Sequence, residues 1–219
     1  IVSSNLLAKE IAGQDISLPP NVYIIGTVNM DETTHPFSKK VLDRANTIEF
    51  NRVQLNHLDF LKELKKVEPI SLKQEAFAAV YLHLKDVYHQ YPHIVEKATT
   101  ELVQINEYLQ PLGAHVGYRV RDEICFYLAY NEEGQLMTFE NAFDHCLLQK
   151  ILPRISGSDA RVQRALEQLF TFCTNIELNE EYDGLLDFTY AKYPKSANKI
   201  LEMLRRLHSD GFTSFWIGM

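Results

Sequence analysis

The stretch from Asn21 to Phe50 constrains the fold most, because two strand-like apolar runs flank one short helical pattern. The first run, VYIIG, is short, continuous and rich in β-branched residues, as in strands buried on both faces of a parallel sheet. A helical pattern follows through FSKKVLDR, with Pro36 in its first turn, and NTIEF reads as a second strand. Strand, helix and strand in this order predict one βαβ unit.

A two-stranded sheet cannot bury both of its faces, so this unit needs further strands. The first residue is Ile1 and not Met, and residues 1–20 read like the middle of a chain. We therefore expect the chain to be a fragment, with the missing strands upstream of Ile1. In such a fragment the strands at 22–25 and 47–50 would expose apolar faces and unpaired edges. Self-association or poor order in residues 1–50 is the expected result.

The remainder of the chain has helical periodicity. Besides a short pattern at 5–13, helices are predicted over 58–67, 71–91, 93–109, 117–131, 139–152, 159–173 and 196–208. The last of these is expected to begin at Ser196 and to end at Gly211. The predicted fold class is mainly α, with the remnant of an α/β/α core (about two strands) in residues 1–52 and a helical part in residues 53–219.

Composition narrows the class of protein. A net charge of −7 argues against a dedicated nucleic-acid surface, although a locally basic region can sit on an acidic subunit. No apolar stretch reaches the roughly 18 residues that a membrane span needs, and no signal peptide opens the chain. Three cysteines without a CxxC pair indicate reduced, mostly buried thiols in a cytoplasmic protein.

Histidine and cysteine spacing predicts no metal site. His83, His89 and His93 cluster, but Pro92 interrupts the helix between the last two, so solvated histidines are expected. His145 and Cys146 are adjacent on a helical pattern and point in different directions, which favours a surface histidine beside a core cysteine. The chain has neither a G-x-x-x-x-G-K-[ST] loop nor an apolar strand ending in Asp-Glu, so alone it should not hydrolyse a nucleotide.

Asn29 lies just past the first predicted strand, where ligands bind in open parallel sheets. An uncharged amide there can hydrogen-bond a phosphate oxygen and an attacking water, although Asn is also common in turns. Arg44 closes the following helical pattern. It either complements the helix dipole or projects from the subunit edge into a neighbour's phosphate site, where such an arginine finger is worth roughly 10³ to 10⁵ in rate.

Arg119 and Arg121 stand at the start of a predicted helix, where a positive charge opposes the helix dipole. Pairing with Asp122 or Glu123 would explain them, and so would an anion held between the two parts of the chain.

The whole segment NVYIIGTVNMDETTHPFSKKVLDRANTIEF resembles the second half of the nucleotide-binding core of AAA+ NTPases. It is most similar to the McrB-type subunit of methylcytosine-specific restriction systems. In that family a strand ending G-T-[MV]-N carries the sensor 1 asparagine, which matches Asn29. The short helix after it ends in an arginine that reaches the neighbouring subunit's nucleotide, which matches Arg44. GYRVRDEI resembles the sensor 2 segment of the helical lid, with Arg119 as the sensor and Arg121 as the competing choice.

LLQKILPRISGS and ANKILEMLRRLHSDGFTSFW also resemble the C-terminal portion of these proteins. Many relatives have two consecutive arginines where this chain has Asp43-Arg44, which leaves the finger on one residue. The family's Walker A and Walker B elements are absent, consistent with a fragment that begins after them.

The resemblance implies a ring, a hexamer in this family, that hydrolyses ATP or GTP with Mg²⁺ between core and lid. It also implies a nuclease partner of the McrC type, DNA contacts through regions outside this chain, and a role in restricting foreign DNA. ATP and GTP are not distinguished by these residues. The alternative is a stand-alone helical module that binds a protein partner and hydrolyses no nucleotide.

Overall fold

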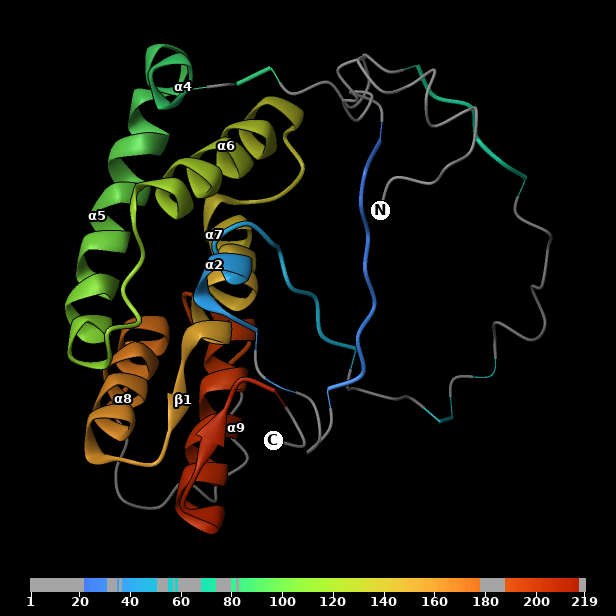
Figure 1. The fold of residues 1–219 in the computed structure, drawn as a ribbon. Coiled ribbons are helices and arrows are strands. Elements are labelled where there is room, and N and C mark those ends of the chain that lie inside the picture. The colour runs from blue at the N-terminus through green and yellow to red at the C-terminus, as the bar shows by residue number, and fades with distance from the viewer. Residues whose placement is uncertain are drawn as a thin grey trace, which may run out of the picture. The chain divides into compact units, whose positions relative to one another are not determined.

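Helices between Leu84 and Asp210 make up most of the structure, a computed structural model (Figure 1). The described residues are 22–30, 35, 37–50, 55–56, 58, 68–73, 80–81, 83–177 and 188–216. The chain divides into two units, of which the first comprises Ile1–Val28 with Asp59–Val80 and the second Asn29–Leu58 with Tyr81–Met219. In the first unit the described residues adopt neither helix nor strand.

The second unit contains all the described helices. In chain order they are α2 (Lys39–Leu42), α4 (Leu84–Gln90), α5 (Pro92–Leu109), α6 (Tyr118–Gly134), α7 (Phe139–Cys146), α8 (Ala160–Thr174) and α9 (Pro194–Asp210). Short turns of other types are η2 (Gln110–Leu112), the π-helical η3 (Leu147–Ile151) and η4 (Leu152–Arg154). The prediction of a mainly α fold is confirmed. None of these helices is long and apolar enough to cross a membrane.

The core of this unit is built from helix faces with a period of three to four residues. On α5 the buried side chains include Ala98, Leu102, Ile105 and Leu109, which form one stripe along the helix. Helix α5 packs against α6 and α8, and α8 packs along α9 (Figure 1). The helices predicted at 93–109, 117–131 and 159–173 are confirmed by α5, α6 and α8, and the helix predicted at 139–152 is confirmed as α-helix over Phe139–Cys146, after which η3 and η4 follow. The histidines at 83, 89 and 93 are exposed as expected, and no metal-binding cluster occurs among the described residues.

Three sequence-based expectations need correction. Residues 22–25 and 47–50 are described but form no strand, and Ile24 and Ile25 are 83% and 91% exposed. A parallel strand requires a hydrogen-bonding neighbour, and none of the described segments provides one. The described part of the chain has one sheet, in which β1 (Ser156–Gly157) pairs antiparallel with β2 (Thr213–Ser214).

The second correction concerns the helix predicted at 71–91. Its residues 71–73 and 80–81 are not helical, and α4 begins at Leu84. The helix predicted at 5–13 lies outside the described residues, and so does the helix predicted at 58–67 except for Leu58, which is not helical.

The third correction concerns the start of α9. The helix begins at Pro194, two residues before the predicted cap Ser196, because Asp144 of α7 caps it from outside. The Asp144 carboxylate is 1% exposed and accepts hydrogen bonds from the backbone N–H groups of Lys195 and Ser196, both at 2.8 Å. A negative charge at a helix N-terminus satisfies orphan donors and complements the dipole. The predicted end of the helix is confirmed, since Gly211 has a left-handed φ of 72°.

We expect Asp144→Ala to lower the free energy of unfolding by about 3 kcal/mol, because it leaves the N–H groups of Lys195 and of the buried Ser196 without their acceptor. Urea denaturation followed by circular dichroism measures the loss. The control is Asp159→Ala, which removes a solvent-exposed cap that bonds the N–H groups of Arg161 and Val162 at the start of α8. Its loss should be clearly smaller, because water replaces the missing acceptor. Equal losses in the two variants would contradict a buried cap.

Both ends of α6 are fixed by asparagines that use their whole amide group. Asn106 of α5 donates to the Val116 carbonyl at 3.0 Å and accepts from the Val116 N–H at 2.8 Å, just before α6 begins. Asn131, near the end of α6, makes the same pair of bonds with Met137 at 2.9 and 3.1 Å. These bonds hold the connections into and out of α6 in one geometry.

The three thiols are buried and free, as the sequence predicts. Burial raises the pKa of Cys125 to about 12 and also raises the pKa of Cys146 and of Cys173.

Because the reactive species is the thiolate, we expect the folded protein to react slowly with an aromatic disulfide reagent at pH 8. Unfolding in urea should return the thiol pKa values to their ordinary range near 8.5 and release three fast equivalents. Absorbance of the released thiolate measures both rates. A thiol that reacts equally fast in the folded protein would contradict its burial.

Candidate functional site

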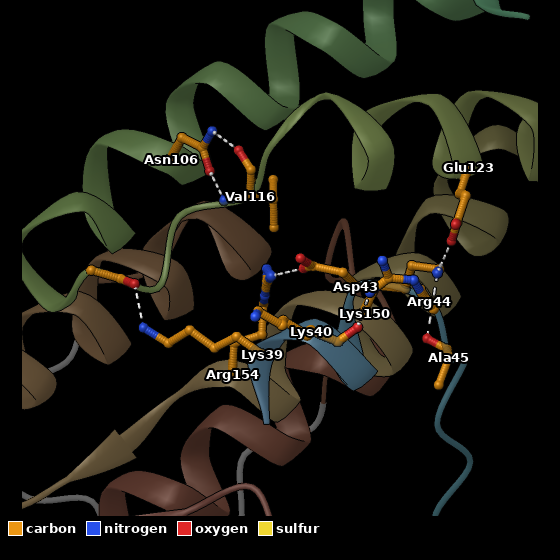
Figure 2. Close-up of polar contacts among 11 residues, drawn as sticks. Lys39, Lys40, Asp43, Arg44, Ala45, Asn106, Val116, Glu123, Lys150 and Arg154 are labelled. Atoms are coloured by element: carbon orange, nitrogen blue, oxygen red, sulfur yellow. Dashed lines mark hydrogen bonds and ion pairs between the residues drawn. The ribbon is translucent and has the colours of Figure 1, made fainter. Parts of the chain in front are cut away.

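The residues from Phe37 to Phe50, here called the α2 segment, lie against the helical part of their unit (Figure 2). With four residues, α2 is too short to be stable by itself, so contacts with other elements must hold it. Leu42 is buried in the core, and the ring of Phe37 meets Trp216 edge to face at 5.7 Å. Lys39 Nζ donates to the Gly113 carbonyl at 2.5 Å. Phe215 and Trp216 are themselves buried, with exposed fractions of 1% and 8%.

Three buried cations of the helical part bind the α2 segment. Arg154 pairs with Asp43, and Lys150 donates to the Ala45 carbonyl at 3.3 Å (Figure 2). Lys199 pairs with Glu49 at 2.6 Å. Lys150 also pairs with Glu123 of α6. The side chains of the three cations are only 4–5% exposed, so each needs its partner to offset the cost of leaving water.

A proline creates a further docking point. The carbonyl of Gln149 would accept from the N–H of residue 153 in a regular helix, but Pro153 has no N–H. Thr47 uses this carbonyl instead, through its backbone N–H at 3.3 Å and its hydroxyl at 2.7 Å. The π-helical turn η3 lies at this point, consistent with the tendency of such turns to mark functional positions.

A cavity of about 320 Å³ opens where the α2 segment meets α6 and η3. Its lining combines aromatic walls with polar groups: Arg44, Asn46, Glu123, Ile124, Phe126, Tyr127, Tyr130, Cys146, Gln149 and Lys150. Arg44 is exposed, and its Nη1 donates to the Lys40 carbonyl at 2.6 Å, the helix-end contact that the simpler interpretation expects. No carboxylate of the described residues pairs with Arg44. Its positive charge therefore stays available to an anion.

The two arginines at the start of α6 differ in their surroundings. Arg121 pairs with Asp122, with its Nε and Nη2 at 2.8 and 2.7 Å from one oxygen, and its guanidinium lies 4.8 Å from the Tyr118 ring centroid. Arg119 is exposed, and its side chain has no hydrogen bond or ion pair with the described residues. No described contact joins Arg119 or Arg121 to Arg44. Asn29 is exposed and belongs to no helix or strand, so the structure does not place it at the end of a strand.

Sequence reasoning missed the buried cations Lys150 and Arg154. The signal for them is their position inside the otherwise apolar stretch LLQKILPRIS, where a charged side chain must either reach solvent or find a partner. Their partners are 27 and 111 residues away in the chain, and no local pattern indicates such pairs. His145, expected at the surface, is half-buried and bonds the Tyr127 hydroxyl at 3.1 Å.

Fold and site together define a mainly helical domain that holds a short, arginine-bearing segment through buried ion pairs. The chain belongs to a family described as a domain of unknown function, DUF8727, whose sequence model matches residues 52–212. No curated protein and no solved structure matches the chain. The match begins beside the boundary predicted between residues 52 and 53, and that boundary stays a prediction.

The pair formed by Asp43 and Arg154 should respond asymmetrically to mutation. Asp43→Ala leaves a buried guanidinium unpaired and should lower the free energy of unfolding by about 3 kcal/mol. Arg154→Met removes the buried charge, and the remaining Asp43 is about one-third exposed and can be hydrated, so its effect should be smaller. Urea denaturation of both variants and of the double variant measures the asymmetry. A larger loss for Arg154→Met would contradict this assignment.

Proposed function

We propose that this chain is the part of an AAA+ NTP hydrolase that runs from sensor 1 through the helical lid, in a protein of the McrB type. The proposal rests on the resemblance of residues 21–50 and 117–123 to that family. A helical domain after residue 80 is consistent with a lid.

The observation that best supports the proposal is the environment of Arg44. The buried cations around it, Lys150 and Arg154, are each paired with a carboxylate, whereas Arg44 is exposed and bonds only a backbone carbonyl among the described residues. Both residues that flank Arg44 in sequence are anchored, Asp43 by Arg154 and Ala45 by Lys150. An unpaired cation on an anchored backbone is what a transferring phosphoryl group requires for electrostatic stabilisation.

In the proposed mechanism Asn29 orients the attacking water or the γ-phosphate. Arg44 reaches the nucleotide of the neighbouring subunit and stabilises the charge that develops during phosphoryl transfer. Arg119 contacts the nucleotide of its own subunit from the lid; the pairing of Arg121 with Asp122 favours Arg119 over Arg121 for this role. Mg²⁺, when bound with ATP or GTP, would neutralise phosphate charge, and residues outside this chain would hold it.

The proposed assembly is a ring of identical subunits, with a hexamer as the form that the resemblance implies. Its proposed setting is the cytoplasm, together with a nuclease partner of the McrC type and with DNA bound through regions outside this chain.

The test is hydrolysis by the full-length protein. We expect Arg44→Ala to lower kcat by about 10³-fold, because trans stabilisation of the transition state is lost. Nucleotide affinity within the subunit should stay within about twofold, because Arg44 belongs to the neighbour's site. Lys40→Ala, an exposed cation on the same short helix, is the matched control and should keep the wild-type rate.

Mixing experiments separate action in trans from action in cis. Subunits carrying Arg44→Ala should regain partial hydrolysis when mixed with subunits that have an intact Arg44 but a disabled nucleotide-binding loop. No recovery, or equal losses of rate and affinity, would count against the trans role. Absence of any hydrolysis by the full-length wild-type protein would favour the alternative of a helical interaction module.

A further inference from the structure

We propose that Lys150 is a positioning residue that couples the start of the lid helix α6 to Arg44. Through this coupling, the nucleotide bound in one subunit sets the orientation of the Arg44 side chain that this subunit presents to its neighbour. This inference rests on the proposed function and adds a route of communication between neighbouring sites. It is carried by the contacts of the Lys150 ammonium group.

Lys150 joins two elements that are distant in sequence. Its side chain is 4% exposed, and its ammonium binds the Glu123 carboxylate of α6 and the Ala45 carbonyl of the α2 segment (Figure 2). Ala45 directly follows Arg44. A displacement of the ammonium therefore acts on the backbone at the base of the Arg44 side chain.

The other end of this connection lies one helical turn from the proposed lid sensor. Arg119 and Glu123 are four residues apart on α6, a spacing that puts their side chains on the same helix face. Asn106 and Asn131 fix the connections at both ends of α6. Because α6 is a continuous helix, a movement at Arg119 is transmitted to Glu123 with little change in their spacing.

Burial makes the link between Glu123 and Lys150 hard to break. Separating them would leave an ammonium in the protein interior without its carboxylate, at a high cost in free energy. When α6 shifts, the ammonium is therefore expected to follow Glu123 and to change its distance to Ala45. On the other side of Arg44, Asp43 is bound to Arg154 of η4, which is not part of α6.

Arg44 thus lies between two anchors from different elements. Arg154 ties Asp43 to η4, and Lys150 ties Ala45 to α6. If α6 moves relative to η4, the backbone between the two anchors must reorient, and the exposed guanidinium of Arg44 reorients with it. Such an arrangement gives a physical basis for coupling, which double variants can test.

The experiment compares two buried ion pairs that both hold the α2 segment. The test variant is the double substitution Lys150→Met with Glu123→Leu, which removes the pair without leaving a lone buried charge. The matched control is Lys199→Met with Glu49→Leu, because this pair holds the same segment from α9 and has no hydrogen bond or ion pair with α6 in the described part of the chain. The full-length protein is used, with urea denaturation to establish that each variant is folded.

Steady-state hydrolysis is then measured against the concentration of ATP or GTP, whichever the wild-type protein hydrolyses. We expect a wild-type Hill coefficient above 1, and for the test variant a Hill coefficient near 1 with kcat about tenfold lower. The control should keep the wild-type Hill coefficient and stay within about threefold in kcat. A purely structural role of Lys150 would make the two double variants alike, because both lose one buried pair.

The outcomes separate this inference from the proposed function. A test variant with wild-type cooperativity, or a wild-type protein with a Hill coefficient of 1, overturns the coupling role even when Arg44→Ala lowers kcat by about 10³-fold as expected. Full hydrolysis by Arg44→Ala instead overturns the proposed function, and the inference with it. Loss of cooperativity in the control variant to the same degree would also overturn the role of Lys150.

Discussion

The α2 segment is held on the helical part by polar groups that find no hydrogen-bond or ion-pair partner within their own elements. Pro153 leaves the carbonyl of Gln149 without a helical donor, and Thr47 supplies two donors to it. The ammonium of Lys150 and the guanidinium of Arg154 are buried and find their acceptors at Ala45 and Asp43. Because each unsatisfied group would be costly alone, the segment and the helical part stabilise one another.

The same principle positions the helices. Asp144 satisfies the first donors of α9 from a different helix, and the asparagines at 106 and 131 satisfy the backbone on either side of α6. These contacts fix the directions of α6 and α9, whereas apolar stripes of the kind seen on α5 supply most of the burial. Apolar side chains can repack when a helix shifts slightly, whereas the hydrogen bonds at the helix ends are made in only one orientation of the helix.

The cations of the site fall into two groups, and the difference between the groups connects the fold to the proposed chemistry. Lys150, Arg154 and Lys199 are buried and bound to carboxylates, so they act within the domain. Arg44 and Arg119 are exposed and have no carboxylate partner among the described residues. Exposed cations of this kind can bind phosphate. Arg44 and Arg119 both fall at positions that the resemblance to AAA+ NTPases assigns to nucleotide contact.

By itself, the sequence determined most of the helices, because α5, α6, α7 and α8 carry apolar residues at helical spacing and their ends carry local signals. It also indicated the burial of the three thiols and the exposure of the clustered histidines. Asn29, Arg44 and Arg119 were selected by resemblance, and their roles remain proposals. The predicted strands at 22–25 and 47–50 did not form, because strand formation requires partners that local periodicity cannot supply.

Only the tertiary structure decided which carboxylate pairs with which cation and where α9 begins. Those contacts join residues up to 150 positions apart, so their energies depend on burial that exists only after the chain has folded.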